Sequence, residues 1–410
     1  MITSRERVLA ALDHQETDRV PIDLGSSRST GINAIAYQKL KQLLGESSDT
    51  VLFDVKQLLA LPDSEILRRL GSDVVILPRL APSLGIPINE YKRGCLPCNG
   101  GECLLPKAFE PIDLPDGGLG VVNGQGRLIA KRPKGGLYFD EIYAPLAECE
   151  SEDEIDALPM PSISDSEMIF QREQAKKLYE ATDFAISGAT SFSLFEKGLK
   201  DWGYENFLIM MMTEPELVEH YLDRLTDAYI VMMERYLEAV GDYVQIVQTN
   251  DDLGQQRGML ISPETYRQMF KPRHARIVQA IKRKNKQMHI YLHCCGSIFP
   301  VIGDLAEVGF DILNPIQKEC DNMDPSEIKR QFGKQLTFWG GGCSTQTTLT
   351  HGSVEDVVEE VKNMLSIFAP GGGYVFSQIH NIQADISPEK ILALFDTALR
   401  YGRAPYGKEC

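Results

Sequence analysis

The stretch Met288-His289-Ile290-Tyr291-Leu292, followed at once by His293-Cys294-Cys295-Gly296, sets the pattern for the whole chain. Its β-branched and aromatic residues are typical of a buried strand. Alternate side chains of a strand point to the same face, so we expect His293 and Cys295 to point together and Cys294 to point away. The strand therefore predicts a pocket rim that carries soft metal ligands.

Cys343 follows another apolar run, Phe338-Trp339-Gly340-Gly341-Gly342, and is the third ligand that we predict. Imidazole and thiolate suit zinc, and three protein ligands with an open fourth position are typical of a catalytic zinc site. The predicted ligands are His293, Cys295 and Cys343. A second interpretation stays open, because buried free cysteines often serve only as small hydrophobic side chains.

Strand patterns recur along the chain, and helical patterns follow each of them. This alternation over 410 residues predicts a (β/α)8 barrel that forms a single domain over residues 1–410. No Gly-x-Gly-x-x-Gly follows the first strand, so a doubly wound dinucleotide-binding fold has no support. The eight predicted strands begin near Val20, Asp73, Phe184, Tyr243, Met288, Phe310, Leu336 and Tyr374.

Residues from about 82 to 145 differ from the rest of the chain. Glycine and proline are frequent there, and short apolar pairs alternate with polar residues. This pattern predicts β-hairpins inserted after the second barrel strand. The segment also contains Cys95, Cys98 and Cys103; a second metal or a redox pair is possible, but we favour an incidental cluster because no matching second pair follows.

The charge balance excludes several classes of partner. The chain has 42 basic and 58 acidic residues and a formal net charge of -16, which disfavours nucleic acid and anionic membranes. The N-terminus has no long apolar region, and no apolar run approaches the roughly 20 residues that span a bilayer. We expect a cytoplasmic protein whose nine cysteines are free thiols or metal ligands.

Polar side chains also follow the fourth predicted strand. Asp251 and Asp252 lie at its carboxyl end, the end at which barrel enzymes keep their active sites. Asp252 is our candidate for a catalytic group, as an oxygen ligand to zinc or as a proton donor to a leaving group. The alternative is that one of the two carboxylates only orders the loop that follows.

Several stretches together resemble one known family, the uroporphyrinogen decarboxylase superfamily, and within it the cobalamin-linked methyltransferases. The resemblance implies the (β/α)8 barrel. It also implies His293, Cys295 and Cys343 as zinc ligands, and His380 as an active-site histidine that orients the substrate or donates a hydrogen bond; a purely structural role for His380 stays open. The stretches are Arg5-Glu6-Arg7-Val8-Leu9, Asp18-Arg19-Val20-Pro21, Asp251-Asp252-Leu253-Gly254, Ile261-Ser262-Pro263-Glu264, His293-Cys294-Cys295-Gly296-Ser297, Asp311-Ile312-Leu313-Asn314-Pro315, Gly372-Gly373-Tyr374, His380-Asn381-Ile382-Gln383 and Ser387-Pro388-Glu389.

The chain departs from the decarboxylases of this superfamily near its first strand. Their signature has the form Arg-Gln-Ala-Gly-Arg-Tyr, and its arginines hold the carboxylates of the porphyrinogen. The corresponding stretch, Leu24-Gly25-Ser26-Ser27-Arg28-Ser29-Thr30-Gly31, has a single arginine. The resemblance therefore disfavours decarboxylation of a substrate with eight carboxylates.

The function that the resemblance implies is methyl transfer that depends on zinc. The chain would move a methyl group from a small methylated substrate, foremost an aryl methyl ether, to the Co(I) corrinoid of a partner protein. It has no Asp-x-His-x-x-Gly cobalamin signature of its own. The alternatives are a methylcobalamin:thiol or tetrahydrofolate methyltransferase, a uroporphyrinogen decarboxylase or other metal-free lyase, and a non-catalytic carrier of folate or corrinoid.

Overall fold

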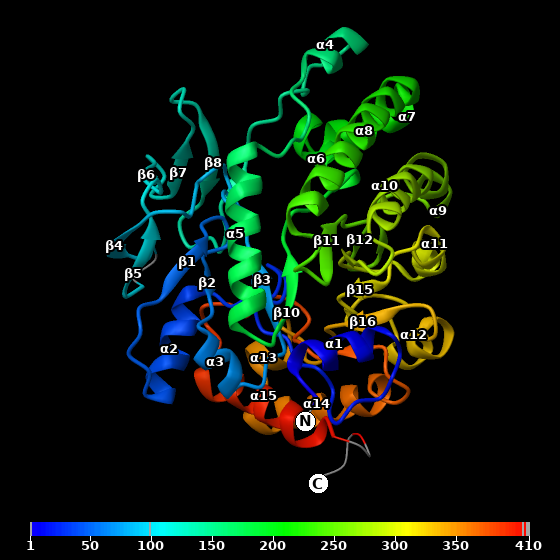
Figure 1. Cartoon of the computed structure of the whole chain (residues 1–410). Helices are drawn as coiled ribbons and strands as arrows, with labels where there is room; N and C mark the ends of the chain where they lie inside the picture. The colour runs from blue at the N-terminus through cyan, green and yellow to red at the C-terminus, as the bar shows by residue number, and fades with distance from the viewer. Residues whose placement is uncertain (1, 98–99, 404–405, 407–410) are drawn as a thin grey trace.

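The computed structural model describes residues 2–97, 100–403 and 406. Its centre is a curled sheet of seven parallel strands, in the order β17-β16-β15-β14-β11-β10-β3 (Figure 1). Each of these strands corresponds to one predicted from the sequence. Their bounds are β3 Val74–Leu77, β10 Ala185–Gly188, β11 Ile246–Asn250, β14 His289–His293, β15 Ile312–Asn314, β16 Thr337–Trp339 and β17 Tyr374–Val375.

The segment around Ile22 closes the sheet into a barrel. Ile22 forms parallel bridges to Ser72, just before β3, and to Phe376, just after β17. The first predicted strand thus takes the eighth position through single bridges and not through a ladder. This arrangement confirms the predicted (β/α)8 barrel.

A buried ion cluster fixes the closure. Arg7 Nη1 and Arg19 Nη1 each lie 2.7 Å from a carboxylate oxygen of Asp73, which is fully buried. The backbone N–H of Ile22 donates to the same carboxylate at 2.9 Å. Two of the N-terminal motifs that carry the family resemblance therefore hold the barrel closed, and their arginines take no part in the pocket described below.

The barrel interior is filled at the amino ends of the strands. Helix α1 (Ser4–Leu12) contributes Val8 and Leu12 to this filling, which leaves the carboxyl ends of the strands for a site. Each strand contributes one inward side chain: Val74, Ala185, Ile246, Tyr291, Ile312, Trp339 and Val375.

Helices cover the outside of the barrel (Figure 1). The helical run from Ser262 to Lys284 begins with an N-cap and a proline and contains a π-helical turn, Tyr266–Phe270. Among the described residues, no helix combines the length and apolar character that a bilayer crossing requires. The helices are α2 Ala34–Leu44, α3 Ser64–Arg69, α4 Glu152–Ala157, α5 Asp165–Ala181, α6 Phe195–Trp202, α7 Tyr204–Thr213, α8 Pro215–Val240, α9 Pro263–Thr265, α10 Lys271–Lys284, α11 Ile302–Val308, α12 Pro325–Phe332, α13 Thr348–His351, α14 Val354–Phe368 and α15 Pro388–Tyr401, with a 3-10 turn at Phe299–Val301.

The inserted segment forms antiparallel hairpins beside the barrel, as predicted. Its β5 also pairs with β1, so the hairpin of β1 and β2 belongs to the same small sheet. The sequence does not predict β1 and β2, because strands this short show no clear alternation of apolar and polar residues. The strands outside the barrel are β1 Val51–Asp54, β2 Leu59–Leu61, β4 Tyr91–Cys95, β5 Glu102–Pro106, β6 Ile112–Asp113, β7 Leu119–Val122, β8 Leu128–Arg132, β9 Asp140–Glu141, β12 Gly254–Gln255 and β13 Gly258–Met259.

The cysteines of the inserted segment that the structure describes differ in burial. Cys95 is exposed and Cys103 is buried. Cys98 lies outside the described residues, so the structure does not test the Cys-x-x-Cys pair.

Candidate metal centre

His293 and Cys295 meet at the carboxyl end of β14. The Cys295 Sγ atom lies 3.2 Å from His293 Nε2. Cys294 between them is fully buried, and its Sγ accepts a hydrogen bond from the backbone N–H of Leu253 at 3.4 Å. The alternation of the strand thus places the imidazole and one thiol on the pocket side and the other thiol in the wall.

His380 is the third member of this cluster. One potential ligand atom from each of His293, Cys295 and His380 lies within 4.8 Å of the other two. Burial, together with the charge of the neighbouring His293, lowers the pKa of His380 to about 4. At neutral pH its imidazole is therefore neutral and offers a lone pair, which is the form that binds metals.

Cys343, the predicted third ligand, is not in the ligand cluster found among the described residues. Its thiol is fully buried and lies 4.0 Å from the backbone oxygen of Ser344. Burial raises the pKa of Cys343, and the charge of Glu360 acts in the same direction. A ligand role for Cys343 stays a prediction, whereas His380, predicted as a catalytic group, lies where a third ligand is needed.

An asparagine fixes the ring of His293. Asn314 donates through Nδ2 to the backbone oxygen of Trp339 at 2.8 Å, so its Oδ1 atom faces His293 Nδ1 at 2.6 Å. An amide oxygen can only accept, hence Nδ1 carries the proton and Nε2 keeps its lone pair on the side of Cys295. Histidine ligands in metal sites are commonly held in this way.

Two carboxylates lie next to the cluster. Asp252 accepts from the backbone N–H of Cys295 at 2.7 Å, and the same oxygen lies 3.8 Å from His293 Nε2. Glu196 accepts from Asn250 Nδ2 at 2.8 Å and from the backbone N–H of Asp252 at 3.2 Å. Burial raises the pKa of Glu196, and the charge of Asp252 raises it further.

The donor set fits a soft or borderline divalent cation. Two imidazoles and a thiol are the side chains that zinc prefers, and the adjacent carboxylates give the site a negative potential. Burial and the charge of Asp252 raise the pKa of Cys295. A bound dication would offset this effect, because it stabilises the thiolate directly.

Asp251 lies in a different environment from its neighbour Asp252. Its carboxylate is fully buried and accepts from the backbone N–H groups of Leu194, Phe195 and Glu196 at 2.8–3.1 Å, where α6 begins. His274 Nε2 lies 2.9 Å from the same carboxylate. Asp251 is therefore the residue of the pair that orders the structure, and Asp252 is the one that faces the pocket.

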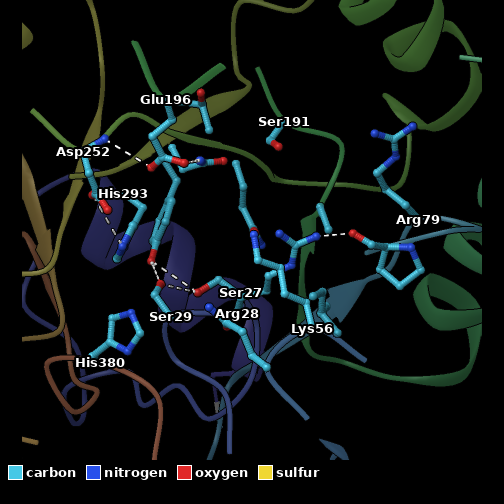
Figure 2. A pocket seen from close by; sticks show the side chains of 18 of the residues that line it. Ser27, Arg28, Ser29, Lys56, Arg79, Ser191, Glu196, Asp252, His293 and His380 are labelled. Carbon is cyan, nitrogen blue, oxygen red and sulfur yellow. Dashed lines mark hydrogen bonds and ion pairs between the residues drawn. The ribbon is translucent and has the colours of Figure 1, made fainter. Parts of the chain in front are cut away.

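The cluster borders a cavity of about 230 Å³ at the barrel mouth. His293, Asp252 and His380 lie at one end, and Arg79 and Lys56 lie at the other (Figure 2). The cavity is lined by Ser27, Arg28, Ser29, Phe53, Lys56, Gln57, Ile76, Arg79, Pro82, Ala189, Ser191, Glu196, Lys200, Gln248, Thr249, Asn250, Asp252, Tyr291, His293 and His380.

Each cation of the cavity has a carboxylate partner. Arg79 forms a two-point contact with Glu167 at 2.7 and 2.9 Å. Lys56 Nζ lies 2.5 Å from Glu141, which belongs to the inserted segment. Arg28, the single arginine of the first loop, contacts Asp54 at 2.8 Å.

Sequence reasoning named Arg28, Asp252, His293 and His380 but missed Glu196, Lys56, Arg79 and Lys200. Lys56 and Arg79 each lie two residues after a strand, β1 and β3, so the position just past a strand is the signal that could have identified them. Glu196 lies in the first turn of α6 and Lys200 in its last turn, four residues later, and both line the same cavity.

Comparisons with known proteins agree with this geometry. Residues 146–401, more than half of the chain, match the family model of uroporphyrinogen decarboxylase (URO-D). The uroporphyrinogen decarboxylase of Hydrogenovibrio crunogenus is 24% identical over 56% of this chain and 66% of its own length. That of Thioalkalivibrio sulfidiphilus is 24% identical over 65% of this chain and 75% of its own length.

A solved structure extends the likeness to nearly the whole chain. A methyltransferase from Methanosarcina mazei superposes with a TM-score of 0.58 over 97% of this chain and 98% of its own, at 20% sequence identity. At this identity the likeness shows a common fold. With the family match over residues 146–401, it confirms the superfamily resemblance found in the sequence, and the chain belongs to the uroporphyrinogen decarboxylase family.

Proposed function

We propose that this chain is a zinc-dependent methyltransferase of a corrinoid methyl-transfer system. It moves a methyl group from a small methylated substrate, foremost an aryl methyl ether, to the reduced corrinoid of a partner protein. The observation that carries this proposal is the cluster of His293, Cys295 and His380 at the rim of a closed-ended barrel cavity.

His293, Cys295 and His380 would hold the metal, with Asn314 keeping the lone pair of His293 Nε2 on the cluster side. When bound, zinc supplies Lewis acidity that stabilises the negative charge on a leaving heteroatom. Asp252 accepts from the backbone N–H of Cys295 and lines the cavity beside the cluster, where it would exchange a proton with a departing oxygen or sulfur atom. In O-demethylation the O–CH₃ bond would break with its electron pair left on oxygen, and the reduced corrinoid of the partner would supply the electron pair that binds the methyl group.

The cavity size supports a small substrate. Pockets for drug-sized ligands typically occupy about 300–1,000 Å³, and this cavity of about 230 Å³ is smaller. A porphyrinogen with eight carboxylates also needs several unpaired cations, whereas Arg28, Lys56 and Arg79 already face Asp54, Glu141 and Glu167. Both observations favour a single-ring substrate over a tetrapyrrole.

Metal analysis of anaerobically purified protein tests the site. We expect about one zinc per chain in the wild type, loss of zinc in His293→Ala and His380→Ala, and retention in Cys343→Ala. Loss of zinc in Cys343→Ala with retention in His380→Ala would assign the third ligand to the cysteine. A wild-type protein without metal would favour a metal-free lyase of the family.

An activity assay tests the reaction. Wild-type protein, a reduced Co(I) corrinoid protein and a panel of methoxylated aromatics should give the demethylated phenol and a methylated corrinoid. Methyl transfer only with thiols or tetrahydrofolate would select those alternatives, and decarboxylation of uroporphyrinogen would overturn the proposal. Substrate or corrinoid binding without any transfer would indicate a carrier protein.

A further inference from the structure

The ring of His380 is oriented by the side chain of Asn381. Asn381 is fully buried, and its Nδ2 donates to Gln57 Oε1 at 3.1 Å. Its Oδ1 therefore faces His380 Nδ1, at 3.1 Å. Because an amide oxygen only accepts, His380 carries its proton on Nδ1, and Nε2 is the nitrogen left with a lone pair.

Tyr138 of the inserted segment completes this arrangement. Its hydroxyl donates to Asn381 Oδ1 at 2.9 Å and accepts from Gln383 Nε2 at 2.7 Å. Tyr138 lies in the loop between β8 and β9, far from the barrel strands in sequence. A residue outside the barrel thus contacts the amide that fixes a histidine inside the site.

The loop that carries Tyr138 is anchored to the barrel mouth. The adjacent Phe139 is fully buried, packs edge-on against Phe109 at 6.1 Å, and donates through its backbone N–H to the oxygen of Lys56 at 2.9 Å. Gln57, the residue after Lys56, is the acceptor for Asn381. Tyr138 and Gln57 therefore approach the Asn381 amide as one packed unit.

The two histidines of the cluster differ in what holds them. The asparagine of His293 donates to the backbone oxygen of Trp339, within the barrel sheet, and accepts one side-chain bond, from the Ser29 hydroxyl. The asparagine of His380 is fixed by the side chains of Tyr138, Gln57 and Gln383, which all contact its amide group. The orientation of His380 consequently depends on side chains that a substitution can remove without changing the barrel.

We propose that Tyr138 is a positioning residue for His380, so that the inserted segment completes the metal site of the barrel. The inference rests on the metal site of the proposed function, but it requires only metal binding and not methyl transfer. Groups that orient metal-ligating histidines typically contribute 10–100-fold in metal affinity. We therefore expect removal of the Tyr138 hydroxyl to weaken zinc binding about tenfold.

Zinc affinity, measured by chelator competition on the full chain, tests the inference. Tyr138→Phe should bind zinc about tenfold more weakly than the wild type. Tyr143→Phe is the matched control, since Tyr143 lies in the same segment, is 47% exposed and packs against Arg127; it should bind as the wild type does. The visible spectrum of the Co²⁺-substituted protein should change in Tyr138→Phe and stay unchanged in the control.

A double-mutant cycle separates positioning from a general structural effect. His380→Ala is expected to lose its zinc on purification, so zinc is added back and the residual affinity that His293 and Cys295 retain is measured. In this background Tyr138→Phe should cause no further loss of affinity, because there is no imidazole left to orient. An equal tenfold loss in that background, an unchanged affinity in Tyr138→Phe, or a wild-type chain without metal would each overturn the inference. Zinc binding that follows the expected cycle without any methyl transfer would leave it standing while the proposed function fails.

Discussion

Asp251 and Asp252 are neighbours at the carboxyl end of β11, yet they face opposite sides of the barrel wall. Asp251 is fully buried and accepts from three backbone N–H groups at the start of α6. Asp252 has a side chain 37% exposed, and one of its oxygens lies 3.8 Å from His293 Nε2. The segment just after β11 thus assigns one carboxylate to the fold and the other to the site.

The difference between them shows how to separate stability from chemistry in this protein. The charge of Asp251 is compensated by the donors around it, so its loss leaves those donors buried without a strong acceptor. The charge of Asp252 is next to Glu196 and the thiol of Cys295, whose pKa values it raises. Substitution of Asp251 should therefore lower stability, whereas substitution of Asp252 should lower activity and leave stability nearly unchanged.

The largest effect on folding is expected for Asp251→Asn. The substitution removes the charge that holds the start of α6 and the partner of His274, and breaking such a buried set costs about 3 kcal/mol. Urea denaturation should show this loss, while Asp242→Asn, an exposed aspartate before the same strand, should stay within about 0.5 kcal/mol of the wild type. Equal stability of the two variants would contradict the structural role of Asp251.

Asp252→Asn should leave the fold intact and impair the reaction. The asparagine can still accept from the backbone N–H of Cys295, so we expect a stability change within about 0.5 kcal/mol. Methyl transfer should fall about 100-fold through kcat, since proton exchange by a positioned side chain typically contributes 10²–10⁴-fold. A wild-type kcat with a higher KM would instead assign Asp252 to substrate binding.

The sequence predicted the strands of the barrel and the positions of His293, Cys295 and Asp252, because strand periodicity fixes which residues share a face. It predicted His380 as an active-site residue but not as a member of the ligand cluster, and the ligand role of Cys343 stays a prediction. Gly340 and Gly341 adopt φ values of +90° and +78°, so the chain turns after β16 and the alternation of that strand does not reach Cys343.

Local sequence patterns also do not predict contacts between segments that are distant in the chain. Tyr138 lies next to Asn381 only because the hairpins of the inserted segment fold back over the barrel mouth. The pairing of β1 with β5 has the same origin. These contacts depend on packing between segments, which neither composition nor period describes.

The smallest expected effect is a pH dependence of stability that comes from Glu196. Its backbone N–H donates to Asp251, and its carboxylate accepts from the backbone N–H of Asp252. Burial and the charge of Asp252 raise its pKa above the ordinary value near 4.5. Between these two pKa values the native state holds a proton that the unfolded state has lost, so stability falls as pH rises through this window. One proton gives a slope of at most about 1.4 kcal/mol per pH unit.

Glu196→Gln should remove this slope, because glutamine does not titrate and still accepts one hydrogen bond from Asn250 or Asp252. Asp252→Asn should shorten the pH range over which stability falls, because it removes a charge that raises the pKa of Glu196. Urea midpoints measured from pH 5 to pH 8 on the wild type and the two variants give all three slopes. If the wild-type slope persists in Glu196→Gln, the titration belongs to another group. If the pH range over which stability falls is narrower in Asp252→Asn but not in Asp242→Asn, Asp252 is the neighbour whose charge raises the pKa of Glu196.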